Sequence, residues 1–283
     1  MALDRNAVGR EVGPSSVSWD SRDVMLYALG VGAGQADALD ELRFTTENSE
    51  GQPLVALPVY AVVLIQRAGA RLDMGPIDRT KLVHAEQGFV LHRPLPLHGT
   101  VQVSARITGI YDKGSGALVS TAATAVDAAT GELLVESQSS AFIRGEGGFG
   151  GERGPAGAAA CPDRAPDVEI AAPTRSDQAL LYRLSGDRNP LHSDPVFARR
   201  GGFDRPILHG MCTYGITGRL LLQALGGGDP ARLRAMSARF TRPVMPGDHL
   251  TVQAWREPGQ VRFRTLGPTG QPVLDYGVLT LAD

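Results

Sequence analysis

The stretch YRLSGDRNPLHSDPVFARRGGFDRPILHG, from Tyr182 to Gly210, is the most informative part of this sequence. It places an acid (Asp187), an amide (Asn189) and a base (His192) within six residues. Gly186 and Pro190 rule out a continuous helix through these three residues. A turn or short overhang should therefore present their polar ends together, which indicates a functional site.

The end of this stretch adds a backbone hydrogen-bond donor to the acid, the amide and the base. Ile207-Leu208-His209-Gly210 opens an apolar run that predicts a buried helix over 208–225. The first N–H groups of a helix have no partner inside the helix, and they favour negative charge. The backbone N–H of Gly210 is thus a candidate donor for an oxyanion close to the acid and the base.

Length, charge and cysteine content exclude several classes of protein. The 283 residues suffice for two domains or one large one, and 42% hydrophobic with 20% charged residues is an ordinary globular composition. A net charge of −2 gives no basic field for nucleic acid or a membrane surface. Cys161 and Cys212 cannot build a disulfide framework. Since neither a leader pattern nor a membrane-length apolar run occurs, we expect a cytoplasmic protein.

The first half predicts helical and apolar segments followed by a sheet. A strand ending at Trp19 should lead into a helix over 22–29, followed by a polar loop over 35–52. The apolar stretch 54–65 is long enough to cross a core. From Lys81 the pattern alternates with period two, and it predicts four strands at 82–91, 99–110, 116–126 and 132–143.

The second half repeats this order after a break. A glycine-rich segment, 145–157, and a proline-rich segment, 162–173, end the alternation. We therefore predict an N-terminal unit over 1–150, a linker over 151–173 and a C-terminal unit over 174–283. Strands of the second unit are expected at 232–240, 249–255, 260–266 and 272–281.

The two halves also share local sequence. Arg93-Pro94-Leu95-Pro96 followed by Thr100-Val101-Gln102 is similar to Arg242-Pro243-Val244-Met245-Pro246 followed by Thr251-Val252-Gln253, at an offset of about 150 residues. One unit is thus expected to occur twice, with the two sheets joined across a pseudo-two-fold axis. The acid, amide and base occur only in the second copy.

These residues resemble the MaoC-like (R)-specific enoyl-CoA hydratases, or hydratase 2. The resemblance is carried by Tyr182 to Ala198 with its Ser-Gly-Asp-x-Asn-Pro-Leu-His core, and by Pro206-Ile207-Leu208-His209-Gly210. Tyr27–Ala33, Leu82–Gln87 and Gly147–Gly151 are also similar to that family, so the match covers nearly the whole chain. It implies an α+β double hot-dog fold, in which each repeat is a long central helix wrapped by an antiparallel sheet. It also points to the two-repeat form found in peroxisomal multifunctional enzymes and in stand-alone bacterial proteins.

The resemblance implies a hydro-lyase that adds water reversibly to trans-2-enoyl-CoA, giving (R)-3-hydroxyacyl-CoA, in fatty acid or related acyl-CoA metabolism. It assigns Asp187 and His192 as the catalytic pair, Asn189 to fixing the water, and the N–H of Gly210 to the oxyanion. Which of Asp187 and His192 acts as base and which as acid stays open, since a coupled pair titrates as a unit. The first repeat would accommodate the acyl chain.

Six further residues are weaker candidates for substrate binding. They are Tyr182, Asp194, His209, Arg205, Glu47 and His84. Tyr182 also fits a packed aromatic, Asp194 a helix cap, and His209 a buried histidine. Glu47 and His84 match family positions in the first half, where they can shape the substrate tunnel or stabilise the fold. Arg205, Arg199 and Arg200 can meet the phosphates of coenzyme A.

No cofactor beyond the coenzyme A of the substrate is expected. His192, Asp194 and His209 lack the spacing of a known metal motif, and the glycine segment 145–157 is no phosphate loop. The expected partners are an acyl-CoA thioester or an acyl carrier protein, and a second copy of the chain in a homodimer. Two rival functions remain open: a hot-dog acyl-CoA thioesterase and a non-catalytic acyl-thioester-binding protein.

Overall fold

Ten strands form one antiparallel sheet in the computed structural model, which describes residues 2–69 and 72–282. The strands of the first half are β1 (Glu11–Trp19), β2 (Leu82–Leu91), β3 (Gly99–Asp112), β4 (Gly116–Asp127) and β5 (Leu133–Arg144). Those of the second half are β6 (Val168–Pro173), β7 (Leu233–Phe240), β8 (His249–Glu257), β9 (Gln260–Leu266) and β10 (Pro272–Leu281). The eight predicted sheet strands are confirmed, with boundaries that move by a few residues.

The strand order repeats between the halves. It runs β1-β3-β4-β5-β2 and continues as β7-β10-β9-β8-β6, which is the same order read inwards from either edge. The two halves meet where Glu86–Val90 of β2 pairs with Ala235–Arg239 of β7 in antiparallel register. This arrangement confirms the predicted joining of two sheets across a pseudo-two-fold axis.

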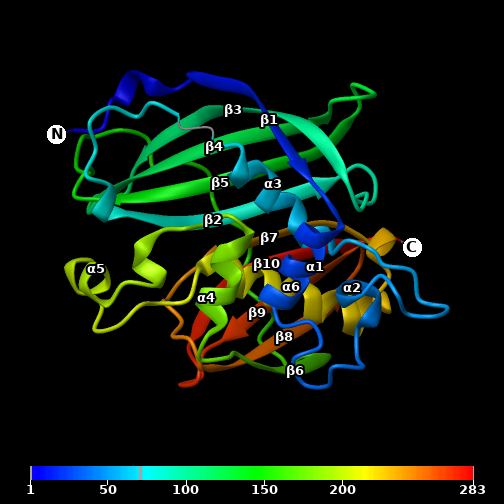
Figure 1. Ribbon diagram of the computed structural model, residues 1–283. Coiled ribbons are helices and arrows are strands. Elements are labelled where there is room, and N and C mark those ends of the chain that lie inside the picture. Colours follow the sequence, from blue (N-terminus) through cyan, green and yellow to red (C-terminus); the bar gives the residue numbers. More distant parts are fainter. Residues whose placement is uncertain (1, 70–71, 283) are drawn as a thin grey trace.

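The helices lie mainly within the curl of the sheet (Figure 1). They are α1 (Ser21–Gly30), α2 (Leu42–Thr45), α3 (Ala61–Arg67), α4 (Gln178–Tyr182), α5 (Pro195–Arg200) and α6 (Gly210–Gly226). Helix α3 packs against β2, β4 and β5, and α6 packs against β6, β7, β8 and β10. Asp20 and Asp23 form a capping box that fixes the start of α1.

The two central helices differ in length, and the difference creates space. Helix α6 has 17 residues, nearly all buried, and Gly218 lets Val59 approach so closely that a Cβ there would lie 2.4 Å from the valine side chain. Helix α3 has only seven residues, preceded by a short 3-10 helix over Pro58–Tyr60, and Gly69 follows it with φ of +61°. The expectation of a long helix therefore fits the second repeat, whereas in the first repeat the helix is short.

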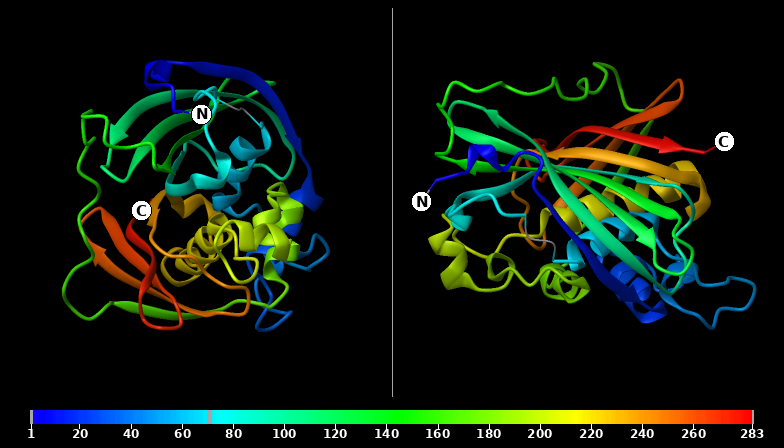
Figure 2. Two further views of the ribbon diagram at one scale, coloured as in Figure 1. Left: turned by 90° about the vertical axis from the view of Figure 1, so that its left-hand side faces the viewer. Right: turned by 90° about the horizontal axis from the view of Figure 1, so that it is seen from above.

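The predicted linker is partly ordered structure. Residues 168–173, which were expected to belong to the linker, form β6 and pair with residues 249–254 of β8. The glycine-rich part runs along the outside of the molecule between the two halves (Figure 2). It is fixed there because the Asp112 carboxylate accepts hydrogen bonds from the N–H groups of Gly148 and Gly150 at 2.9 and 2.7 Å.

The segment 35–52 was predicted to be a polar loop without regular structure, but part of it is helical. It contains α2, which places Phe44 in the core and the Glu41 carboxylate against Arg219 of α6. Gln223 also donates to Glu41 at 3.0 Å, so this loop joins the first half to the central helix of the second. Within the described residues, no helix has the length and apolarity needed to cross a bilayer.

Candidate active site

The turn after α4 presents the acid and the amide. Gly186 has a φ of +144°, which an L residue rarely adopts, so the chain can turn sharply there. The Asp187 carboxylate then accepts a hydrogen bond from the N–H of Asn189 at 3.0 Å. The Asn189 side chain in turn accepts one from the N–H of Leu191 at 3.0 Å and caps a 3-10 helix over Pro190–His192. The turn chemistry of Asx residues thus holds Asp187 and His192 on one surface.

His192 is held in one tautomer. Its Nδ1 lies 2.9 Å from the carbonyl oxygen of Ile207, and because a carbonyl only accepts, Nδ1 carries the proton. The other ring nitrogen, Nε2, therefore keeps a lone pair while the ring is neutral. Burial lowers the pKa of His192, which favours this neutral form at pH 7. His192 is thus arranged to accept a proton.

A second histidine lies against the first. The rings of His192 and His209 stack with centroids 3.7 Å apart and planes inclined by 28°. A carboxylate oxygen of Asp187 and one nitrogen of each ring lie within 4.8 Å of one another. A single water can bridge two atoms at such a distance, because each hydrogen bond spans about 2.8 Å. The acid and the base can therefore share one water.

Asp187, His192 and His209 are also residue types that bind metal ions, and one ligand atom of each lies within 4.8 Å of the others. One nitrogen of each ring already donates to a backbone carbonyl, Nδ1 of His192 to Ile207 and Nε2 of His209 to Asp187. That no metal takes part stays a prediction.

Gly210 begins α6 and lines the same cavity as Asp187 and His192. The preceding residue, His209, supplies no side-chain cap, so no side chain occupies the N–H groups of Gly210 and Met211, whereas the N–H of Cys212 donates to the His209 carbonyl. Met211 also lines this cavity. A Cβ on Gly210 would lie 3.1 Å from the ring of Phe240, so the close packing of Phe240 leaves little room for a side chain.

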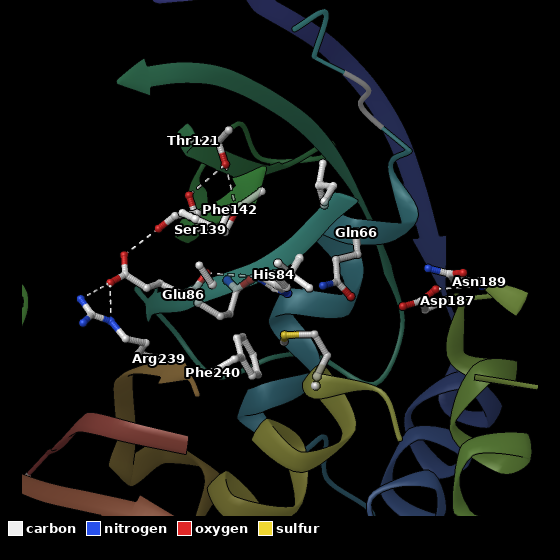
Figure 3. A pocket seen from close by; sticks show the side chains of 18 of the residues that line it. Gln66, His84, Glu86, Thr121, Ser139, Phe142, Asp187, Asn189, Arg239 and Phe240 are labelled. Atoms are coloured by element: carbon white, nitrogen blue, oxygen red, sulfur yellow. Dashed lines mark hydrogen bonds and ion pairs between the residues drawn. The ribbon is translucent and has the colours of Figure 1, made fainter. Parts of the chain in front are cut away.

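A cavity of about 1190 Å³ extends from this group into the first half. Figure 3 shows Asp187 and Asn189 at one side of the pocket, the Glu86–Arg239 ion pair at the other, and His84 between them. His84 stacks on Phe240 with centroids 4.7 Å apart, and its Nε2 donates to the carbonyl of Glu86. Burial lowers the pKa of His84 to about 4, so His84 is a neutral wall residue at pH 7.

The inner part of the cavity is lined by small residues of the first sheet. Those on β3, β4 and β5 include Ala105, Thr121, Ala123, Ser137 and Ser139. Helix α3, with seven residues, covers less of these strands than the 17-residue α6 covers in the second half. The short helix and the small side chains leave room for the cavity, which Leu118 and Phe142 also line.

A second cavity of about 940 Å³ shares Asp187 and Asn189 in its lining and carries positive charge. Arg144, Arg188 and Arg200 line it, and all three are exposed. Arg67 also lines it, but its guanidinium is bound to the hydroxyl of Tyr60 at 2.9 Å. Asp187 thus lines both cavities and His192 only the larger one, and the arginine-rich second cavity, called the mouth below, adjoins the acid.

The structure brings five of the ten candidate residues into the larger cavity: Asp187, Asn189, His192, Gly210 and His84. Tyr182 and His209 are almost fully buried, and their rings pack against each other in a tilted arrangement with centroids 4.9 Å apart. Asp194 caps α5 by accepting from Val196 N at 2.7 Å. Glu47 and Arg205 are exposed and line neither cavity.

Sequence reasoning missed several wall residues, above all Phe240, Gln66 and the Glu86–Arg239 pair. Glu86 lies within the stretch 82–87 that was noted for its resemblance, so that stretch was a usable signal. Arg239 and Phe240 end a strand that looked like ordinary sheet. Their position depends on the divergence of β2 from β7 beyond Glu86, which no local pattern encodes.

Comparison with known proteins agrees with this geometry. A family described as MaoC like domain matches residues 158–275, and one described as MFE-2 hydratase 2 N-terminal domain matches residues 17–145. The chain is 47% identical to the 3-hydroxyacyl-thioester dehydratase Y of Mycobacterium tuberculosis, with 99% of this chain and 98% of the relative covered. It is 41% identical to the enoyl-CoA hydratase ChsH3 of the same organism, with 93% and 92% covered.

The fold agrees as well. The crystal structure of a MaoC-like dehydratase from Phytophthora capsici superposes with a TM-score of 0.88 at 31% identity, covering 100% of this chain and 98% of that one. The architecture is the double hot-dog fold, as the sequence predicted.

Proposed function

The chain belongs to the MaoC-like hydratase 2 family and is a hydro-lyase, and on this premise we propose that it adds water reversibly to trans-2-enoyl-CoA thioesters. The product is the (R)-3-hydroxyacyl-CoA. The observation that carries the proposal is that the Asp187 carboxylate and the His192 ring line one cavity, with a carboxylate oxygen and a ring nitrogen within 4.8 Å, close enough to share a water. The helix start at Gly210 faces the same space.

The reaction places a hydroxyl on C3 and a proton on C2. His192 Nε2 accepts a proton from the bound water as the oxygen attacks C3, since its tautomer leaves that nitrogen free. Asp187 holds the water and shares with His192 the proton that the water loses. This pair then delivers the proton to C2. The free amide hydrogen of Asn189 is available to orient the same water, because its side-chain oxygen is already occupied.

Negative charge develops on the thioester oxygen during the attack. The N–H of Gly210 lies at the start of a buried helix, where such charge is favoured. One donor of this kind contributes about 10²–10³ in rate, and general acid–base catalysis about 10²–10⁴. The addition of water involves no net oxidation or reduction, so the proposed chemistry needs no redox cofactor, and we assign its steps to the side chains of Asp187 and His192 and to the backbone N–H of Gly210.

The two cavities suggest how the thioester lies. We place the acyl chain in the 1190 Å³ cavity of the first half and the coenzyme A in the mouth beside Arg144, Arg188 and Arg200. Of these, Arg200 was among the arginines expected at the phosphates from sequence. An acyl carrier protein would present its phosphopantetheine to the same mouth.

The carrier can be tested through the mouth arginines. Arg188→Gln and Arg200→Gln should raise the KM for enoyl-CoA by about tenfold, with kcat little changed, because a phosphate contact is lost in ground and transition states alike. An N-acetylcysteamine thioester has no nucleotide phosphates and is the matched control, for which the KM should not move. Equal effects on both thioesters would contradict a phosphate contact.

The central experiment follows the loss of enoyl absorbance for trans-2-enoyl-CoAs of increasing length, with chiral analysis of the product. Asp187→Asn and His192→Ala should each lower kcat by about 10²–10⁴, and the exposed Asp204→Asn is the matched control. Release of free thiol in place of hydration would identify a thioesterase. Thioester binding without turnover in either direction would identify a binding protein.

We further propose that the protein is a cytoplasmic homodimer. The two cysteines are free and Cys212 is buried, which suits a reducing compartment. Light scattering at working concentration should give twice the mass of the 29.9 kDa chain. A monomer would contradict the dimer, and secretion of the full chain in cell fractionation would contradict the location.

A further inference from the structure

We propose that His209 is a positioning residue that holds Asp187, His192 and the start of α6 as one unit. The proposal rests on the hydratase function proposed above. It concerns a residue that the substrate does not reach, because His209 lines neither of the two cavities.

His209 makes a different contact with each catalytic element. Its Nε2 donates to the backbone carbonyl of Asp187 at 3.2 Å, which fixes the turn that carries the carboxylate. Its ring stacks on the ring of His192 with centroids 3.7 Å apart, and Nδ1 of that ring is held by the hydrogen bond to Ile207 that fixes the tautomer. Its own backbone precedes Gly210 and accepts the first hydrogen bonds of α6, from Cys212 and Thr213.

The burial of His209 argues that its polar atoms are retained for a reason. Only 1% of the residue is exposed, and Tyr182 packs against the ring at 4.9 Å. Because Nε2 donates, Nδ1 is an acceptor, yet it is buried without a hydrogen-bond partner. An unsatisfied buried acceptor costs about 1–3 kcal/mol. A phenylalanine would fill the same space without that cost, so packing alone does not explain a histidine here.

The surroundings also keep His209 uncharged. Burial lowers its pKa to about 3, with His192 and Arg183 acting in the same direction against the carboxylate and carbonyl of Asp187. Tyr182, which packs against the ring at 4.9 Å, has a pKa raised by burial and stays neutral. A neutral His209 donates to Asp187 without placing a second charge beside His192. The lone pair of His192 Nε2 is therefore preserved across the neutral pH range.

Two substitutions separate the two contacts. His209→Gln places an amide nitrogen near the position of Nε2, so it keeps the donor to Asp187 but removes the aromatic stack. His209→Phe keeps the stack and removes the donor. Each should lower kcat by about 10–100-fold with the KM within about threefold of the parent, because small displacements of reacting groups have effects of this size while the substrate loses no contact.

The pH profile distinguishes positioning from a merely structural role. His209→Gln admits water beside His192, so the acidic limb of kcat/KM should move up towards pH 6.5, the ordinary pKa of histidine. His209→Phe keeps the site apolar, so the acidic limb of its kcat/KM profile should lie at the same pH as in the parent or at a lower pH. Thr217→Val is the matched control, since it removes a buried hydrogen bond on the same helix, to Thr265 at 2.7 Å, away from both cavities.

Histidine ring nitrogen NMR gives a readout that does not depend on turnover. In the parent, His192 should show a protonated Nδ1 and a pKa below 6.5, and His209→Gln should raise that pKa. A kcat within twofold of the parent in both variants, with an unchanged pH limb, would overturn the proposal. If the parent does not hydrate any enoyl-CoA, the proposed function fails, while the NMR titration still decides whether His209 controls His192.

Discussion

In the proposed mechanism, His192 and Gly210 act through atoms that their neighbours leave free. The hydrogen bond from Nδ1 to Ile207 leaves Nε2 of His192 as an acceptor, and the missing side-chain cap leaves the N–H groups of Gly210 and Met211 as donors. Neither feature depends on the residue type alone. At the scale of single residues, the chemistry is therefore set by which backbone partners are already occupied.

The tight space at Gly210 makes a first prediction. Gly210→Ala adds a Cβ at 3.1 Å from the ring of Phe240, so either that ring or the helix start must move by a few tenths of an ångström. We expect kcat to fall by about tenfold, with the KM within about threefold, because the oxyanion donor is displaced. Steady-state kinetics on a short enoyl-CoA measures this effect.

A double-mutant cycle checks the cause. Phe240→Leu shortens the side chain that Gly210→Ala would meet, so the double variant should recover part of the kcat that Gly210→Ala loses. Strictly additive losses would show that the two residues do not interact in this way.

At the scale of elements, the site depends on two helices of unequal length. The alternation of the strands and the apolar run of α6 were visible in the sequence, because both are local periodicities. The Asp187–His192 turn was also predictable, since Gly186, Asn189 and Pro190 have strong turn preferences. The short length of α3 was not, because the stretch 54–65 is apolar throughout and does not show that the helix begins only at Ala61.

Long-range pairings explain what else the sequence could not show. Residues 168–173 look like a proline-rich linker, yet they become a strand because β8 offers them a free edge. The stacking of His209 on His192 joins residues 17 positions apart through the packing of α6, and the hydrogen bond to Asp187 spans 22 positions. Patterns of neighbouring residues do not encode such contacts.

The space left by α3 makes a second prediction. Ala123 of β4 faces the cavity and lies opposite Ala105 of β3 and Ser137 of β5, so three small residues adjoin. Ala123→Leu should raise the KM for long-chain enoyl-CoAs by about tenfold, because the added side chain occupies the path of the acyl chain. Crotonyl-CoA, the short substrate, should be hydrated with kcat/KM within about threefold of the parent.

The neighbouring position supplies a control. Ala122 points to the opposite face of β4, so Ala122→Leu leaves the cavity unchanged. If Ala123→Leu affected short and long substrates equally, the acyl chain would not lie along this face.

At the scale of the whole molecule, the two halves form one structural unit. The sheet continues across the β2–β7 pairing, and one hydrophobic core cluster includes residues of both halves, from Val17 to Leu279. Asp187, His192 and Gly210 of the second half face a cavity built largely from the first. The proposed reaction therefore requires both halves to be folded together.

Two tryptophans allow this unity to be tested. Trp19 lies in β1 and Trp255 in β8, one in each half, and both are buried. Trp19→Phe leaves Trp255 as the single tryptophan, so its fluorescence reports on the second half. Trp255→Phe leaves Trp19, which reports on the first half. Because the core is shared, we expect urea unfolding to give the same transition by fluorescence as by circular dichroism in both variants. Two separate transitions, one for each fluorophore, would show that the halves unfold independently.

The buried histidines of both halves predict how stability depends on pH. The pKa of His84 is lowered to about 4 and that of His209 to about 3, and burial also lowers the pKa of His192. The ordinary value of 6.5 applies in the unfolded chain. Between these values the unfolded state binds more protons than the folded state, so the free energy of unfolding rises with pH in this range. The stability is complete above about pH 6.5 and is lost as the pH falls towards 4.

The size of the effect follows from the number of groups. Each such histidine contributes a slope of up to about 1.4 kcal/mol per pH unit below its unfolded pKa. Urea unfolding at several pH values between about pH 7.5 and pH 4.5 should therefore show a steep loss of stability, and His84→Gln should reduce the slope by about the share of one histidine. His249→Gln is the matched control, because that side chain is exposed and remains in water in both states. A stability that stays constant down to pH 5 would contradict the burial of these neutral rings, and with it the neutral His192 on which the proposed proton transfer depends.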